Sequence, residues 1–310
     1  MDLIESIKRL LSSDDPVAVA VPLDQRRINA KVAIEAWLRS QTTTHYGLAP
    51  NKFAERLRAL VDAPQTLRQG GYNWCLPATF LHSALRRVPD LVAQFGMDLY
   101  SKGEGSLGDI DVTMTEAYQA FDYPEAGVRA NPRVTEFNWD LFLASHADWI
   151  LIGAIQDETT IYPMSGSPRD PISWSAGTLV ELFEDCGFYE DVTTLSITDK
   201  KDRQKLVAAL DKSRTTHDVL LVGGLDRFGV SGMGDHAARL VAPPVITPNG
   251  NSSGTAADKE TMTFQYWSWG FQGSDLAGLP FDAAQNAYTS TQTRHQFESF
   301  TIIVAEPKPL

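Results

Sequence analysis

One cysteine stands where a thiol can become a nucleophile. Cys75 precedes Leu76 and Pro77, and apolar residues then recur at helical spacing through Leu85. Because proline suits the first turn of a helix, this pattern predicts a helix that begins at or just before Cys75. A thiol there faces unsatisfied backbone N–H groups and the positive end of the helix dipole, which favour the thiolate. We expect Cys75 to be catalytic; the alternative is a small buried hydrophobe, the role we assign to Cys186.

A glutamine six residues upstream strengthens this prediction. Gln69, a glycine, four further residues and Cys75 resemble the segment of papain-like cysteine enzymes that carries an oxyanion-stabilising glutamine and the nucleophile. An amide held beside the helix start can donate to the oxygen that becomes negative, together with the backbone N–H of Cys75. The alternative for Gln69 is an exposed loop amide. In the family an aromatic residue follows the cysteine, whereas here Trp74 precedes it, and residues 75–78 (CLPA) are more similar to bacteriocin-processing peptidases.

The general base is expected to be His236. Residues 234–237 (GDHA) open an apolar stretch after a glycine-rich loop and resemble the start of the histidine strand in papain-like enzymes. His236 follows Cys75 by 161 residues; the family interval is roughly 130 to 150, and a modest insertion accounts for the difference. His82 would lie about 10 Å from Cys75 along the same helix, too far to pair. The alternative for His236 is a polar residue that closes a loop.

The third catalytic position departs from the family pattern. Residues 267–270 (WSWG) resemble the Asn-Ser-Trp-Gly motif that orients the imidazole, but Trp267 stands where asparagine is expected. Side chains alternate along a strand, so Gln265 shares a face with Trp267. Gln265 is therefore the candidate orienter of His236. The alternatives are a site that works as a dyad, or one that has lost its activity.

The resemblance implies a cysteine peptidase that acts on a protein or peptide. Cys75 would attack an amide carbonyl, His236 would protonate the leaving amine, Gln69 would stabilise the oxyanion, and water would release the acyl enzyme. The same chemistry with another amide or acceptor would make a deamidase, transglutaminase or acyltransferase, for instance a toxin or effector. A third possibility is a catalytically inactive papain-like fold used for binding.

The first part of the chain is expected to form a helical extension, residues 1–65, before a papain-like domain, residues 66–310. Amphipathic patterns predict three short helices, at residues 2–11, 25–39 and 50–61. In the second helix, Ile28, Val32 and Ala36, with Ala33 and Trp37 beside them, form an apolar stripe that we expect to pack inward.

The remaining pattern predicts helices first and strands afterwards. A hairpin is expected from residues 97–100 and 109–114, and helices at residues 174–188 and 200–210. Strands are expected at residues 218–224, 237–242, 261–269 and 300–305, where β-branched and aromatic residues are frequent. This order predicts an α+β, papain-like fold with a helical lobe followed by an antiparallel sheet lobe.

Composition narrows the classes of partner. A net charge of -12 repels nucleic acid. The start of the chain has no signal-peptide pattern, and the apolar runs fall short of the ~20 residues that span a bilayer. We therefore expect no membrane insertion and a cytoplasmic protein, or one delivered to another cell by a signal-peptide-independent system. Two cysteines are too few for a disulfide framework, and neither metal-ligand spacing nor a phosphate loop occurs, so we assign no metal and no cofactor.

Overall fold

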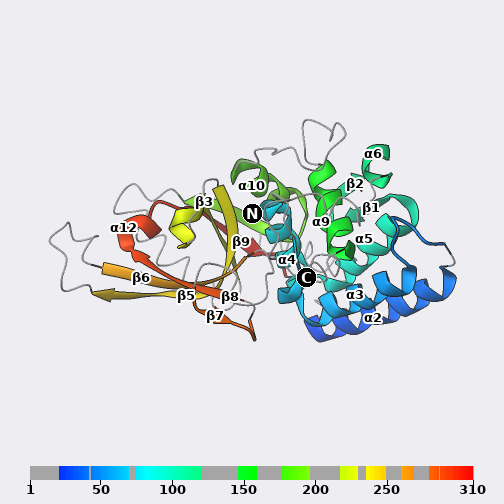
Figure 1. Ribbon diagram of the computed structural model, residues 1–310, viewed down its shortest axis with the longest axis horizontal. Coiled ribbons are helices and arrows are strands. Elements are labelled where there is room, and N and C mark those ends of the chain that lie inside the picture. Colours follow the sequence, from blue (N-terminus) through cyan, green and yellow to red (C-terminus); the bar gives the residue numbers. More distant parts are fainter. Residues whose placement is uncertain are drawn as a thin grey trace, which may run out of the picture.

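The computed structural model has a helical lobe and a sheet lobe, and the helix that begins at Cys75 lies between them (Figure 1). It describes residues 21–41, 43–69, 74–120, 146–158, 176–195, 217–229, 235–248, 260–268, 279–285 and 287–309. The helices expected at residues 2–11 and 200–210 lie outside the described residues.

Helices form the first lobe and a small hairpin caps it. The main helices are α2 (Leu23–Ser40), α3 (Pro50–Asp62), α4 (Cys75–Arg87), α5 (Pro89–Lys102), α9 (His146–Glu158) and α10 (Ala176–Asp185). The short helices of this lobe are η1 (Pro64–Thr66) and α6 (Glu116–Gln119), and the hairpin pairs β1 (Glu104–Leu107) with β2 (Ile110–Thr113). Two further short helices, η2 (Leu225–Phe228) and α12 (Arg294–Phe297), lie in the sheet lobe (Figure 1). Prolines occupy the first position of α3 and α5, where no N–H is needed.

The second lobe is a seven-stranded antiparallel sheet. Its strands are β3 (Tyr189–Leu195), β4 (Asp218–Gly224), β5 (Asp235–Pro248), β6 (Glu260–Trp267), β7 (Phe281–Asp282), β8 (Ala287–Thr293) and β9 (Thr301–Pro307). Their spatial order is β3-β9-β4-β5-β6-β8-β7, and every neighbouring pair is antiparallel. The predicted α+β class, with helices followed by an antiparallel sheet, is confirmed.

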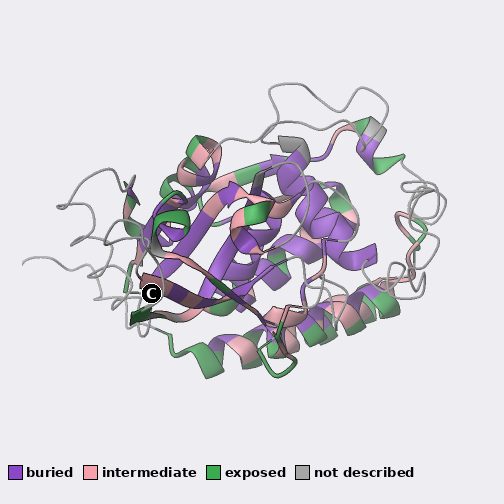
Figure 2. Ribbon diagram, turned by 60° about the vertical axis from the view of Figure 1, so that its left-hand side comes forward, coloured by how far each residue is buried: buried purple, intermediate pink, exposed green. Residues whose placement is uncertain are grey.

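The two faces of the sheet belong to two cores. The helix-facing core joins the buried faces of the helices to sheet residues such as Leu220, Ala237 and Trp267. The outer core covers the opposite face and contains Ala238 and Tyr266. Consecutive residues thus enter different cores, as strand geometry requires. Figure 2 shows the buried parts of both lobes in purple.

The predicted hairpin was right in its second strand, because β2 lies within residues 109–114, and wrong in its first. Residues 97–100 belong to α5, whose buried side chains Val92, Phe95 and Leu99 recur at helical spacing. The helix ends where Gly103 adopts a left-handed conformation with φ of 77°. The hairpin then forms from β1 and β2, immediately downstream.

The apolar stripe predicted for α2 was wrong in part: Ala33 and Trp37 pack against the helix-facing core, but the other three residues do not. Ile28, Val32 and Ala36 are exposed, whereas Ala30 and Ile34 are buried in the helix-facing core (Figure 2). The contacts of Trp37 explain which face of α2 is buried, because its ring packs edge-on against both Phe53 and Tyr100. The helix turns its largest side chain inward and leaves two aliphatic ones outside.

Residues before and after position 66 share the helix-facing core, which contains Ile34 of α2 and Phe53 of α3 together with Phe80 of α4. The division at residue 65 therefore marks no gap in packing among the described residues. Within those residues, no helix combines the length and the apolar character needed to cross a membrane.

Candidate functional site

Cys75 is the first residue of α4, as predicted from Pro77. It is partly exposed, and it packs against the helix-facing core. The preceding residue, Trp74, makes no side-chain cap to the helix. The thiol is thus carried on a helix start, the position in which backbone N–H groups favour a thiolate.

A threonine one turn further along α4 joins the cysteine to the histidine strand. Thr79 Oγ1 lies 2.6 Å from Cys75 O, to which it donates, and 3.4 Å from Ala237 O. The two carbonyl oxygens are therefore at most about 6 Å apart, the sum of these distances. Because Ala237 follows His236 in β5, the start of α4 lies beside the start of the strand that carries the predicted base.

His236 is buried and held by a hydroxyl group. Its Nε2 lies 2.5 Å from Ser268 Oγ, in a hydrogen bond whose donor depends on the tautomer of the imidazole. The ring also meets Phe228 edge-on, with centroids 5.2 Å apart. Phe228 belongs to the outer core, so this ring contact lies on the side of the sheet opposite to the helix-facing core against which Ala237 and Cys75 pack. The ring orientation of His236 is thus fixed by one polar and one aromatic contact.

Burial determines the charge of this histidine. Loss of hydration lowers the pKa of His236 to about 3. The imidazole is therefore neutral at pH 7, which is the form that can accept a proton.

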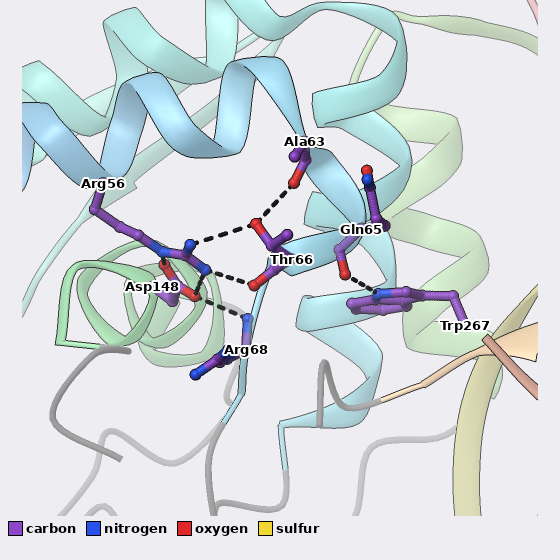
Figure 3. Close-up of polar contacts among 7 residues, drawn as sticks. All are labelled: Arg56, Ala63, Gln65, Thr66, Arg68, Asp148 and Trp267. Carbon is purple, nitrogen blue, oxygen red and sulfur yellow. Dashed lines mark hydrogen bonds and ion pairs between the residues drawn. The ribbon is translucent and has the colours of Figure 1, made fainter. Parts of the chain in front are cut away.

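Gln69 is 5% exposed, so it is a buried amide and not the exposed loop residue of the alternative interpretation. The stretch before it is anchored to both lobes. Arg68 N donates to Asp148 of α9 at 2.8 Å, and Trp267 Nε1 of β6 donates to Gln65 O at 3.0 Å (Figure 3). The backbone that leads to Gln69 is thus fixed immediately before the amide.

Gln265 does not reach His236, so its predicted role as orienter was wrong. The register of the sheet pairs Gln265 with Ala242 of β5 and with Thr289 of β8. Ala242 is six residues from His236, a distance of about 20 Å along a strand. Gln265 does lie on the same face as Trp267, but that face is not the one on which His236 lies.

Ser268 is the functional candidate that sequence reasoning missed. The signal was present, because Ser268 is the serine of the WSWG segment, one residue after the position at which asparagine was expected. Trp267 itself has a different use: it stacks on His82 with centroids 3.9 Å apart and hydrogen-bonds Gln65. His82 is therefore a core residue of α4.

The second cysteine has the environment of an inert thiol. Cys186 is fully buried and its Sγ donates to Phe183 O at 3.3 Å. Burial raises the pKa of Cys186 to about 12. Across the described ranges, no three or more His, Cys, Asp or Glu side chains gather closely enough to hold a metal ion.

Comparison with known proteins leaves the family open. No family model, no curated protein and no solved structure matches the chain. The chemistry of the site must therefore be argued from its own geometry.

Proposed function

We propose that the chain is a papain-like cysteine hydrolase, a peptidase in its simplest form, with Cys75 as nucleophile and His236 as base. The observation that carries the proposal is the contact of Thr79 Oγ1 with the carbonyls of Cys75 and Ala237. It brings the helix start that carries the thiol beside the first residues of the strand that carries the buried imidazole, and the proposal requires the His236 ring, which Phe228 meets on the outer-core side, to reach the thiol at this end of β5. These are the parts that nucleophilic acyl transfer requires.

The proposed reaction begins with a neutral pair. Cys75 Sγ attacks the carbonyl carbon of an amide while Nδ1 of His236 accepts the thiol proton. For this step Nε2 must carry the other proton, and Ser268 Oγ accepts it. The oxyanion takes hydrogen bonds from the Gln69 amide and the backbone N–H of Cys75.

The second half of the reaction consumes water. His236 returns its proton to the amine nitrogen, the C–N bond breaks, and a thioester on Cys75 remains. Water then attacks the thioester with His236 as base, which restores the thiol and releases the acid. A deamidase follows the same steps on a side-chain amide, and a transglutaminase or acyltransferase replaces water with another acceptor.

A second candidate function is supported by the burial of the histidine. His236 is 3% exposed and packs on Phe228, an environment that also suits a structural core residue. In that case the fold would serve binding, and Cys75 would have ordinary thiol reactivity.

Labelling with a thiol-directed epoxide and with iodoacetamide separates the two candidates. If the hydrolase proposal holds, both reagents modify Cys75, modification is retained in Cys186→Ala, and His236→Ala slows it at least tenfold. His217→Gln is the matched control, because His217 is also buried, lies 3.1 Å from a carboxylate oxygen of Glu306, and precedes β4 at the end opposite to Gly223, which pairs with His236.

Digestion of fluorescent casein provides the second readout. Activity that disappears in Cys75→Ala and persists in His217→Gln supports the peptidase. A rate of Cys75 labelling that is the same in the parent protein and in folded His236→Ala would rule out the base and favour the binding protein.

A further inference from the structure

A buried carboxylate holds the backbone immediately before Gln69. Asp148, in the first turn of α9, is fully buried and accepts hydrogen bonds at both carboxylate oxygens. Its Oδ2 lies 2.8 Å from Arg68 N and 2.6 Å from Arg56 Nη2, and its Oδ1 lies 2.7 Å from Arg56 Nε (Figure 3). The Arg56 pair is bidentate, the geometry with the strongest directional preference.

Arg56 also donates hydrogen bonds to the turn that precedes Gln69. Arg56 Nη2 donates to Thr66 O at 2.5 Å and Nη1 donates to Thr66 Oγ1 at 3.3 Å. Thr66 Oγ1 in turn donates to Ala63 O at 2.8 Å. Figure 3 shows that one guanidinium from α3 thus joins Asp148 to the backbone of residues 64–68.

The next residue of α9 holds the other side of the segment. Trp149 packs against Trp74, with ring centroids 6.0 Å apart, and Trp74 directly precedes Cys75. Trp149 is itself stacked on Tyr118 at 4.4 Å. Two consecutive residues of α9 therefore contact the chain just before Gln69 and just before Cys75.

We propose that Asp148 is a positioning residue for catalysis, which fixes the Gln69 amide relative to Cys75. This inference rests on the proposed hydrolase function. Its physical basis is that an oxyanion donor is effective only when it is held in place before the reaction. Asp148 acts at a distance, through Arg68 N and Arg56, and touches no reacting atom. Trp267 supports the same stretch from the sheet through Gln65 O.

Two reagents that differ in their need for an oxyanion site test the proposal. Acylation of Cys75 by p-nitrophenyl acetate passes through a tetrahedral oxyanion, and release of p-nitrophenolate reports the rate. Alkylation by iodoacetamide is a displacement at a saturated carbon and forms none. Asn at position 148 offers one acceptor oxygen in place of two, so Asp148→Asn must lose part of the network.

We expect Asp148→Asn to slow acylation about tenfold or more, as removal of an oxyanion donor does, and to change alkylation less than twofold. Gln69→Ala should give the same pattern. In the double variant the two effects should not multiply, because both act on one donor. Trp267→Phe keeps an aromatic ring and removes the Nε1 donor, and it should slow acylation relative to alkylation to a smaller extent. It provides a second test if Asp148→Asn fails to fold.

Asp218→Asn is the matched control, since Asp218 is equally buried and paired with arginines but contacts Arg87 at the end of α4, away from the segment before Cys75. It should leave the ratio of acylation to alkylation unchanged. If Gln69→Ala lowers this ratio and neither Asp148→Asn nor Trp267→Phe does, the positioning role is wrong while the hydrolase stands. If p-nitrophenyl acetate reacts equally with Cys75→Ala, the hydrolase proposal itself has failed.

Discussion

Two buried carboxylates form networks at opposite ends of α4: the network of Asp148 reaches the segment before the helix, and the network of Asp218 includes Arg87, its last residue. Asp148 binds one arginine and a backbone N–H, and its network leads to the segment before Cys75. Among the described residues, the donors to Asp218 are three side chains: Arg87 Nε at 2.7 Å, Arg239 Nε at 2.6 Å and Tyr189 OH at 2.7 Å. The first network fixes the path of a loop, whereas the second joins α4 to three strands. A buried carboxylate bound to arginine therefore positions the segment of the candidate site before α4, and a second one stabilises the fold at the end of α4.

The electrostatic balance of the Asp218 network explains why it tolerates burial. Burial alone would raise the pKa of Asp218, but Arg239 and Arg87 outweigh it and hold the pKa well below its ordinary value. Burial also raises the pKa of Tyr189 well above its usual range, so the phenol stays a donor. Every charge in this network thus has a partner on another element.

The largest expected effect comes from removing Asp218. Asp218→Ala should lower the free energy of unfolding by about 3–5 kcal/mol, because it leaves buried arginines without their counter-charge. Asp148→Ala should cost less, since Arg56 keeps its bond to Thr66 O. Urea unfolding of the two variants measures the difference. Equal losses would mean that the two networks do not differ in their structural role.

A fall in pH should lower the stability of the protein through His82, which lies next to the Asp218 network. Burial, followed by Arg239 and Arg86, lowers the pKa of His82 well below its usual value. A histidine with a depressed pKa in the folded state contributes stability above its unfolded pKa of about 6.5, and that stability is lost as the pH falls. Neither nitrogen of His82 has a hydrogen-bond partner in the part of the chain described.

His82→Phe, which can keep the stack on Trp267, should therefore be more acid-resistant than the parent protein. Between pH 6.5 and pH 5 the parent should lose up to about 2 kcal/mol that the variant retains. Urea unfolding at the two pH values is the measurement, and Asp148→Asn is the comparison, because its network contains no histidine. If the parent protein and His82→Phe lose the same free energy of unfolding between the two pH values, His82 is not the cause of the acid sensitivity. His236 is then the next group to test.

The smallest effect is expected at a neutral contact that belongs to neither network. Ser268→Ala removes the hydroxyl beside His236 Nε2 and should cost about 1 kcal/mol of stability. Alkylation of Cys75 should slow by less than in His236→Ala, because the dyad can still form. Gln265→Ala is the control and should change neither quantity. An effect of Gln265→Ala as large as that of Ser268→Ala would contradict the register of β5 and β6.

Local patterns were enough to place several elements. Pro77 and the apolar periodicity predicted that α4 begins at Cys75, and the β-branched run predicted β4 over Asp218–Gly224. These features depend on residues close in the chain, and backbone geometry alone decides them. The burial of Cys186 followed in the same way from the ordinary preference of free cysteine.

Features that depend on distant residues could not be read in this way. Arg56 and Asp148 are 92 positions apart, and nothing in either local sequence indicates the other. The same holds for Ser268, whose contact with His236 depends on how two strands end and not on the alternation that suggested Gln265. In α2, two faces offered apolar residues, and only packing on Phe53 and Tyr100 decided between them.

The position of β9 has a consequence for synthesis of the chain. β9 follows the other described strands along the sequence, yet it lies inside the sheet between β3 and β4, and among the described strands β3 pairs with β9 alone. While the ribosome is still translating residues 301–307, β4, β5 and β6 can already pair, but β3 has no partner and one side of β4 stays open. The nascent chain therefore carries unprotected strand edges until β9 has been made, and those edges are the natural targets of aggregation and of chaperones.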